Sequence, residues 1–323
     1  MTSNGSRESE RTLLTGLALA RSVLDRDDSS RSNQEVMMRR WTDPSSRLVT
    51  VVNDTARIVD GGSGIALDLV SPSEIESASI ADSFFLGNDE TGAAMFGASA
   101  VDEESAPPAN PGTKWESLRD VGAKLGPRDS EMFTTTLGLA NWHRTHQRCS
   151  KCGALTVPER SGWVRRCTVD QSEHFPRTDP AVIMLVLDAD DRALLGNRVG
   201  WSPQWYSTLA GFVEPGESAE AAVAREVSEE VGLTVDRSTV SFLGSQPWPF
   251  PSSIMLGFHA YATGDTKPKP DGDEIASARW FSREEMRAAC ESGDVQVPST
   301  VSIARHLIEA WCGDQLPGEW SRR

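Results

Sequence analysis

The spacing of apolar and polar residues changes several times along the first part of the chain. Leu13, Leu14, Leu17 and Val23 recur at helical spacing and predict an amphipathic helix over 11–25. The polar residues that follow, to about position 42, predict no regular element. Short β-rich runs come next and predict a small meandering sheet, with strands over 48–52, 56–59, 65–70, 83–86 and 93–96.

An acidic, proline-rich segment at 102–113 separates these strands from two helical patterns. The patterns lie near 114–125 and 128–146. A cysteine-containing segment then runs from Cys149 to about Pro176.

The second half of the chain alternates between strand and helix patterns. Residues 181–187 form a strongly β-prone run, and the turn at 188–191 predicts that 193–196 pairs back as a hairpin. A helix follows Gly211. Further strands are expected near 239–245 and 254–262, and a final helix near 299–313.

Composition restricts the class of protein. The 323 residues suffice for two domains, and 32 Lys and Arg against 47 Asp and Glu give a net charge of −15. This balance argues against broad electrostatic binding to nucleic acid or to an anionic membrane, but it allows one phosphate site bridged by metal. The longest aliphatic run, 181–187, is far too short for a bilayer span.

The N-terminal residues and the cysteines indicate the compartment. The N-terminal residues lack the basic start and apolar stretch of a secretory signal. Five cysteines, an odd number, do not suggest a disulfide framework. We therefore expect a cytoplasmic protein.

The helix after Gly211 carries the most informative pattern. Pro215 and Gly216 make a turn, Ser218 is a suitable N-cap, and Gly232 follows the last turn. An apolar stripe for the core comprises Ala219, Ala222, Val223, Val227 and Val231.

Three carboxylates share a different face of the same helix. Glu226, Glu229 and Glu230 stand at i, i+3 and i+4 and repel one another. A divalent cation would neutralise them, and hard oxygen ligands suit Mg²⁺ or Mn²⁺. On spacing alone, a solvated acidic face is the better interpretation, because such faces are common.

The complete segment resembles the Nudix box, GX5EX7REUXEEXGU with U aliphatic. Every fixed position matches: Gly211, Glu217, Arg225, Glu226, Val227, Glu229, Glu230, Gly232 and Leu233. The resemblance implies an α/β/α sandwich with a mixed sheet that hydrolyses a nucleoside diphosphate linked to another moiety. It also implies that Glu226 and Glu230 ligate metal, that Glu229 contributes to metal binding or water activation, and that Arg225 orients Glu217.

A second motif follows at 245–253, where prolines alternate with Trp248 and Phe250 in a stiff segment. By composition alone it is a rigid packing loop. It resembles SQPWPFPxS, the signature of the NADH pyrophosphatase branch of the Nudix proteins, without a mismatch. The resemblance implies a dinucleotide-binding loop made of Gln246, Pro247, Trp248, Pro249, Phe250, Pro251, Ser252 and Ser253.

Other positions match that branch singly. The resemblance implies metal ligation by the Ala210 carbonyl and by Glu274. It implies substrate contacts from Phe175, Phe212, Ala304 and Arg119. The alternatives are purely structural roles: the two phenylalanines would lie in the core, and Glu274 and Arg119 would be ordinary surface charges.

The cysteine segment looks like three-quarters of a zinc ribbon. Cys149 and Cys152 form a CxxC pair, and Cys167 follows at ribbon spacing. Relatives in this branch place a second CxxC there, whereas Asp170 stands at the fourth position here. We expect a structural zinc with Asp170 as the fourth ligand; His174 as the ligand, or a site that has lost its metal, are the alternatives.

Together these features predict an α+β protein with three parts. Residues 1–147 form an N-terminal domain that is mainly β with some helices, residues 148–177 a zinc-ribbon segment, and residues 178–315 a Nudix domain. The resemblance implies metal-dependent hydrolysis of NADH or NAD to nicotinamide mononucleotide and AMP, removal of an NAD cap from RNA to leave a 5′-monophosphate, and a homodimer.

Two other functions compete with this one. A non-enzymatic NAD sensor or RNA-binding module would not need the intact carboxylates Glu226, Glu229 and Glu230. A generic Nudix hydrolase of ADP-ribose would not need the intact 245–253 segment.

Overall fold

The computed structural model describes residues 13–60, 62, 64–74 and 79–320, which form two compact units. One unit comprises 18–179 together with 247–253. The other comprises 180–246 and the chain from 254 onward, together with the segment that ends at Leu17. Each unit is described by itself.

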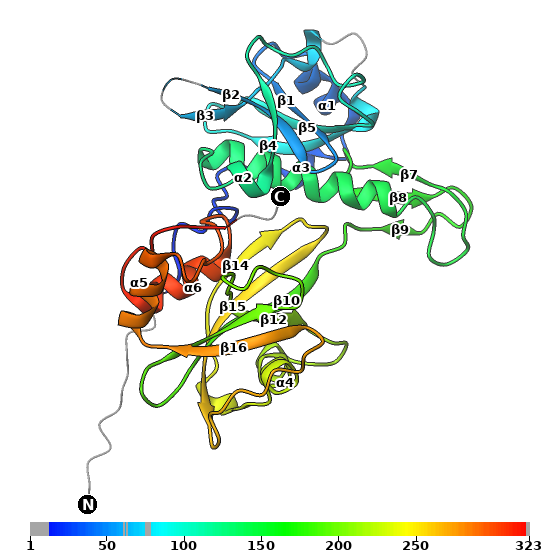
Figure 1. The fold of residues 1–323 in the computed structure, drawn as a ribbon. Helices are drawn as coiled ribbons and strands as arrows, with labels where there is room; N and C mark the ends of the chain where they lie inside the picture. Colours follow the sequence, from blue (N-terminus) through cyan, green and yellow to red (C-terminus); the bar gives the residue numbers. More distant parts are fainter. Residues whose placement is uncertain (1–12, 61, 63, 75–78, 321–323) are drawn as a thin grey trace, which may run out of the picture. The chain divides into compact units, whose positions relative to one another are not determined.

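The unit that begins at residue 18 contains a six-stranded sheet in the order β3-β2-β1-β5-β4, with β6 paired to β2 (Figure 1). Its strands are β1 (Arg47–Val52), β2 (Thr55–Asp60), β3 (Ile65–Leu67), β4 (Ser83–Asn88), β5 (Ala94–Ala100) and β6 (Lys114–Ser117). Helix α3 (Pro127–Thr145) packs on β1, β4 and β5. The smaller helices are η1 (Asp28–Ser30), α1 (Gln34–Trp41), η2 (Pro72–Glu74), η3 (Ile80–Asp82) and α2 (Leu118–Val121).

Several predictions for this unit need correction. The expected strands are present, but β1 pairs in parallel with β5, so the sheet is not a simple meander. Residues 13–25 form no helix, because the backbone N–H groups of Val23 and Leu24 donate to the buried Glu131 carboxylate instead. The rest of that predicted helix, residues 11 and 12, lies outside the described residues.

Two further differences concern short elements. The polar stretch before residue 42 contains α1, whose N-cap Asn33 accepts a hydrogen bond from Val36. The pattern at 114–125 begins as β6 because Trp115 pairs with Arg57 of β2, and only Leu118–Val121 is helical.

The ribbon segment is a small three-stranded antiparallel sheet. Its strands are β7 (Thr156–Glu159), β8 (Val164–Cys167) and β9 (Glu173–His174), in that order. Its cysteines lie in the loop at Cys149–Cys152 and at the last residue of β8, Cys167.

The unit that begins at residue 180 has a seven-stranded sheet in the order β13-β15-β10-β11-β16, with β12 paired to β10 and β14 to β15. The strands are β10 (Asp179–Leu187), β11 (Ala193–Arg198), β12 (Leu209–Phe212), β13 (Thr234–Val235), β14 (Ser241–Trp248), β15 (Ser253–Thr263) and β16 (Ile275–Phe281). The helices are α4 (Ala219–Val231), η4 (Arg237–Thr239), α5 (Arg283–Ser292) and α6 (Ile303–Cys312).

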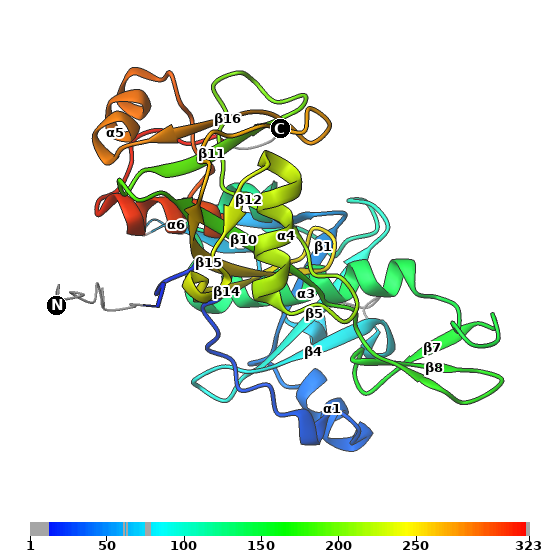
Figure 2. The same ribbon diagram turned by 90° about the horizontal axis from the view of Figure 1, so that it is seen from below.

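Strand β10 is buried on both faces, which explains its uninterrupted apolar sequence. Val182, Met184 and Val186 enter the core that contains the buried side chains of α4. The alternating residues Ile183 and Leu185 enter a second core with residues of α5 and α6. Helix α4 thus covers one face of the sheet and α5 with α6 the other, which confirms the predicted α/β/α sandwich (Figures 1 and 2).

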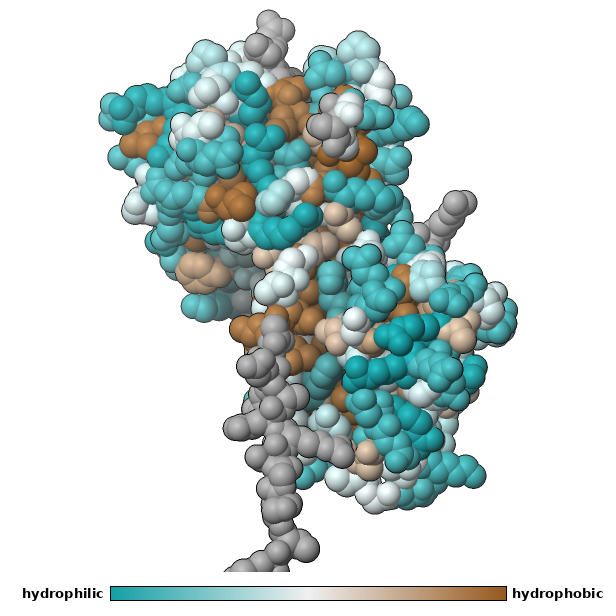
Figure 3. Space-filling model, turned by 90° about the vertical axis from the view of Figure 1, so that its left-hand side faces the viewer, coloured by the Kyte–Doolittle hydropathy of each residue, from teal (hydrophilic) through white to brown (hydrophobic). Residues whose placement is uncertain are grey.

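On the face seen in Figure 3, hydrophilic residues cover most of the area and hydrophobic residues lie in smaller patches between them. Among the described residues, no helix combines the length and the apolar character that crossing a membrane requires.

Candidate active site and metal centres

Helix α4 carries the predicted carboxylates and is fixed at both ends. The Ser218 hydroxyl accepts a hydrogen bond from the Ala221 N–H at 3.2 Å, and Gly232 ends the helix with φ 65° in the left-handed region. Its apolar stripe is buried, with Val223 and Val227 fully inaccessible. Burial of the stripe leaves the glutamate face on the other side of the helix.

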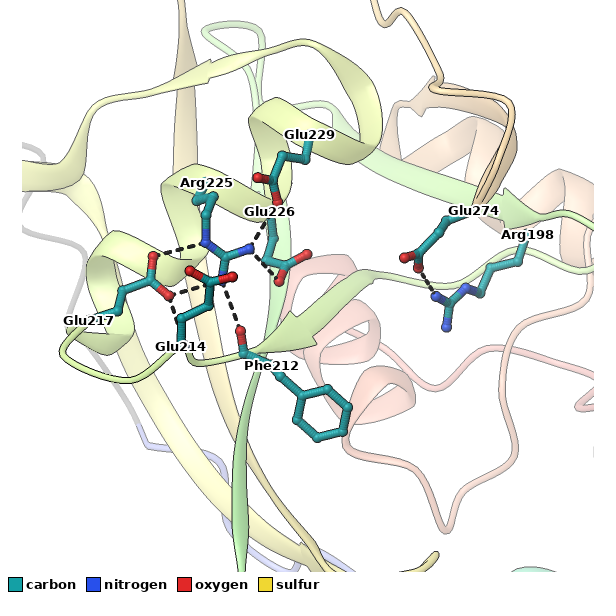
Figure 4. Close-up of polar contacts among 8 residues, drawn as sticks. All are labelled: Arg198, Phe212, Glu214, Glu217, Arg225, Glu226, Glu229 and Glu274. Carbon is teal, nitrogen blue, oxygen red and sulfur yellow. Dashed lines mark hydrogen bonds and ion pairs between the residues drawn. The ribbon is translucent and has the colours of Figure 1, made fainter.

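Arg225 organises the start of the carboxylate face (Figure 4). Its Nε and Nη2 atoms each donate to one oxygen of Glu217 at 2.9 Å, and Nη2 also donates to the Phe212 carbonyl at 2.8 Å. Its Nη1 atom donates to Glu226 at 2.8 Å and to Glu229 at 2.9 Å. One guanidinium therefore fixes three carboxylates, and it holds the pKa of Glu217 below its usual value.

Glu230 is the most unusual of the four glutamates. The residue is only 3% exposed, and its Oε2 atom has no hydrogen-bond partner among the described residues. Burial raises the pKa of Glu230 to about 8, and the negative charges of Glu226, Glu274 and Asp271 act in the same direction. Burial also raises the pKa of Glu226.

Glu226 and Glu230 have the donor chemistry of a divalent-metal site, although among the described residues they form no close three-ligand cluster with Glu274. A buried carboxylate oxygen without a partner is costly unless a cation or a proton neutralises it. Glu226 and Glu230 offer hard oxygen ligands, which Mg²⁺ and Mn²⁺ prefer. The chemistry of these two carboxylates therefore suits the Mg²⁺ or Mn²⁺ that the sequence resemblance implies.

Gly211 makes room for one of these ligands. A Cβ atom at position 211 would lie 1.9 Å from Cδ and 2.0 Å from Oε1 of Glu226. No side chain fits there, so the Glu226 carboxylate lies directly against the backbone of β12. The same strand carries Ala210, which pairs with Ile183 of β10.

Two residues that the sequence analysis did not single out hold Glu274. Asp271 donates its N–H to the Glu230 carbonyl at 3.1 Å, and its Oδ1 atom accepts from the N–H groups of Glu274 and Ile275 at 3.2 and 2.9 Å. Arg198 forms an ion pair with the Glu274 carboxylate. The Asp-Gly-Asp-Glu sequence could have revealed Asp271 as a turn residue, whereas Arg198 gives no local signal.

The 247–253 segment is anchored within the unit that contains α3. Asn141 of α3 donates its Nδ2–H to the Pro249 carbonyl at 3.0 Å. Asp179 accepts a hydrogen bond from the Ser252 hydroxyl at 2.8 Å, and its N–H donates to the Ser252 carbonyl at 2.8 Å. The segment is therefore held from two sides.

Arg119 stacks on the aromatic residues of this segment. Its guanidinium carbon lies 3.7 Å from the ring centroid of Phe250 and 5.0 Å from that of Trp248. The two rings contact each other edge to face at 4.9 Å. The structure thus brings together three side chains that the sequence analysis linked to the substrate.

The ribbon places four candidate zinc ligands together. The ligand atoms of Cys149, Cys152, Cys167 and Asp170 all lie within 4.8 Å of one another. The Sγ atoms of Cys152 and Cys167 are 3.4 Å apart, and Cys149 Sγ is 3.6 Å from Asp170 Oδ2. Tetrahedral zinc with Zn–S bonds of about 2.3 Å requires comparable spacings, so this cluster fits zinc.

Local hydrogen bonds prepare the cluster for a cation. The Ser172 hydroxyl lies 3.4 Å from Cys149 Sγ and is the main cause that lowers the pKa of Cys149 to about 6. Hydrogen bonds from Ser172 also hold the pKa of Asp170 well below its usual value. His174 lies outside the cluster, with its Nε2 atom 3.4 Å from the Ser172 hydroxyl.

Comparisons with known proteins identify the two parts of the chain that contain these residues. Residues 177–298 match the family described as NUDIX domain, and residues 144–175 match the NADH pyrophosphatase zinc ribbon domain. The NAD-capped RNA hydrolase NudC of Mycobacterium bovis (strain BCG / Pasteur 1173P2) is 39% identical over 304 residues, which cover 91% of this chain and 94% of the relative. The chain belongs to the NADH pyrophosphatase branch of the Nudix hydrolase family.

Two other relatives support the same assignment. The NAD-capped RNA hydrolase NudC of Mycobacterium tuberculosis (strain ATCC 25618 / H37Rv) is 38% identical over 91% of this chain and 94% of the relative. The protein of that name from Stutzerimonas stutzeri (strain A1501) is 39% identical over 66% of this chain and 73% of the relative.

The other predicted contact residues of this Nudix hydrolase differ in exposure. Phe175 and Phe212 are each 60% exposed, and the Phe212 ring points away from Arg225 (Figure 4). Gln246 is fully buried and donates to the Val301 carbonyl at 2.9 Å. Ala304 is only 1% exposed, at the start of α6. The two phenylalanines therefore offer free ring surface to a ligand, whereas Gln246 and Ala304 offer almost none here.

Proposed function

We propose that this Nudix hydrolase cleaves the pyrophosphate bond of NADH and NAD, giving a nicotinamide mononucleotide and AMP. The same reaction on NAD-capped RNA releases nicotinamide mononucleotide and leaves a 5′-monophosphate. The single observation that carries the proposal is the carboxylate face of α4, where the buried Glu230 has no partner for its Oε2 atom among the described residues.

The donor set supports Mg²⁺ or Mn²⁺ as the catalytic cation. Glu226 and Glu230 would hold it, with Glu274 and the Ala210 carbonyl as further ligands. A divalent cation neutralises phosphate charge and lowers the pKa of a bound water, which is what pyrophosphate hydrolysis needs.

The surrounding residues position this site and its water. Arg225 is committed to Glu217, Glu226 and the Phe212 carbonyl, so it orients ligands and does not act as a free cation. Glu229 is the most exposed carboxylate that Arg225 contacts, with 60% of its side chain accessible. We infer that Glu229 accepts a proton from water. Water attacks one phosphorus atom, and the bridging oxygen leaves with the other phosphate.

The first prediction concerns the bond that is cleaved. We expect NADH with Mg²⁺ or Mn²⁺ to give reduced nicotinamide mononucleotide and AMP, because the carboxylate site acts on phosphorus. Mass spectrometry of the products identifies the bond. Nicotinamide and an ADP-ribose product would instead show glycosidic cleavage and contradict the proposal.

The second prediction concerns Trp248. We propose that Trp248 and Phe250, stacked with Arg119, contact the dinucleotide. Trp248→Ala should raise KM for NADH by roughly tenfold, since loss of a base-stacking ring costs about 1–3 kcal/mol. KM for ADP-ribose should change much less. Trp115→Ala is the control, since Trp115 lies under Arg57 in the same unit, and an equal loss on both substrates with Trp248→Ala would make the segment a packing element only.

A further inference from the structure

Arg198 and Glu274 are brought together by the main chain of the Nudix sheet. Arg198 is the last residue of β11, and Glu274 directly precedes β16, its antiparallel neighbour. The Val199 N–H donates to the Glu274 carbonyl at 2.9 Å, and the register shifts between Asn197 and Arg198. The pairing of β11 with β16 therefore places the side chains of Arg198 and Glu274 next to each other.

The ion pair itself is easily exchanged. The Arg198 side chain is 41% exposed and the Glu274 side chain 59% exposed, and ion pairs this open to solvent add little to stability. The Glu274 backbone is held separately by Asp271, so the carboxylate can change partner without a backbone movement.

The pair also lies within electrostatic reach of the carboxylates on α4. The charge of Glu274 acts on both Glu226 and Glu230, and the charge of Arg198 acts on Glu230. Figure 4 shows Glu274 and Arg198 facing each other beside the group around Arg225. A divalent cation on α4 would attract Glu274 and repel the guanidinium.

We propose that the Arg198 guanidinium pairs with the Glu274 carboxylate while no divalent ion is bound. When the ion binds, Glu274 becomes its ligand, and Arg198 then pairs with a phosphate of the substrate. The inference rests on the proposed function, because it takes the α4 carboxylates as the cation site. It assigns to Arg198 a role in metal affinity and in binding of the diphosphate.

The test is a Mn²⁺ titration followed by electron paramagnetic resonance of the free ion, without substrate. Arg198→Ala should bind Mn²⁺ about three- to tenfold more tightly than the unaltered protein, because a competing and repelling charge is removed. Arg198→Lys, which keeps the charge, should stay close to the unaltered protein. Unchanged or weaker binding by Arg198→Ala would overturn the proposal.

The matched control is Arg283→Ala. Arg283 forms a similarly exposed ion pair with Asp191, at 43% and 50% side-chain exposure, beyond the opposite end of β11. Its loss should leave Mn²⁺ affinity unchanged. An equal gain in affinity from Arg283→Ala would show a general effect of charge and overturn the specific role of Arg198.

A second measurement tests the phosphate contact. At saturating Mn²⁺, Arg198→Ala should raise KM for NADH by about tenfold while kcat changes less. An unchanged KM would overturn this half of the proposal. Glu230→Gln distinguishes failure of this proposal from failure of the proposed function. If Glu230→Gln binds Mn²⁺ as tightly as the unaltered protein, the proposed cation site is wrong, irrespective of the result for Arg198→Ala.

Discussion

Replacing Glu230 with glutamine should lower kcat/KM for NADH by about a thousandfold or more, because a metal ligand contributes several kcal/mol to the transition state. The fold should survive, since Gln has nearly the same volume and no described residue forms a hydrogen bond with the Oε2 atom of Glu230. Steady-state kinetics over a wide range of Mg²⁺ or Mn²⁺ concentrations measures the effect.

The same substitution should change how stability depends on pH in metal-free protein. Burial raises the pKa of Glu230 to about 8, so the folded state favours the protonated group. Stability from this group is complete below its unfolded pKa of about 4.5 and is lost as pH rises through 8. The loss amounts to roughly 2–4 kcal/mol, and Glu230→Gln should abolish it. Thermal unfolding in EDTA at pH 5 and pH 8 compares the two proteins.

The control for both measurements is Glu220→Gln. Glu220 is an exposed carboxylate in the first turn of the same helix. Its replacement should leave both turnover and the pH dependence of stability nearly unchanged. Normal turnover by Glu230→Gln at saturating metal would contradict the claim that the α4 carboxylates hold the catalytic cation.

Removing zinc from the ribbon should destabilise the part of the chain that presents Phe175 without directly abolishing catalysis. Four protein ligands leave no open position for water, so the ion is structural. One zinc per chain is expected by elemental analysis of protein purified without chelators. Chelation should expose the ribbon to proteolysis, because metal binding and folding are coupled in such small segments.

Two substitutions identify the fourth zinc ligand. Asp170→Ala should weaken zinc retention by about tenfold or more, since its carboxylate lies within the cysteine cluster. His174→Ala should retain zinc, because His174 lies outside the cluster. Zinc loss only in the histidine variant would move the ligand to His174, and little zinc in the unaltered protein would mean that the site has decayed.

The elements that the sequence predicted correctly are those specified by residues close together in the chain. The N-cap, apolar stripe and C-terminal glycine of α4 act within a few residues, so the helix from Ala219 to Val231 follows from them. The predicted helix over 11–25 fails for the opposite reason. Its apolar residues have distant partners: the Leu14 N–H donates to the Leu243 carbonyl, and the N–H of Leu24 donates to Glu131.

Site contacts that depend on the pairing of distant strands could not be predicted from the sequence. Arg198 and Glu274 are 76 residues apart, and only the pairing of β11 with β16 brings them together. The three cysteines and Asp170 could be grouped beforehand because their spacing matches a known ribbon. The homodimer, the cytoplasmic location and the boundaries at 147 and 177 stay predictions from the sequence.

The most direct test of the central claim uses RNA that carries a 5′-NAD cap. Incubation with Mg²⁺ or Mn²⁺ should release nicotinamide mononucleotide and leave a 5′-monophosphate, as seen by mass spectrometry and by sensitivity to a monophosphate-dependent exonuclease. Glu230→Gln, tested beside it, should leave the cap intact. Release of free nicotinamide with both phosphates left on the RNA, or equal decapping by Glu230→Gln, would contradict the account.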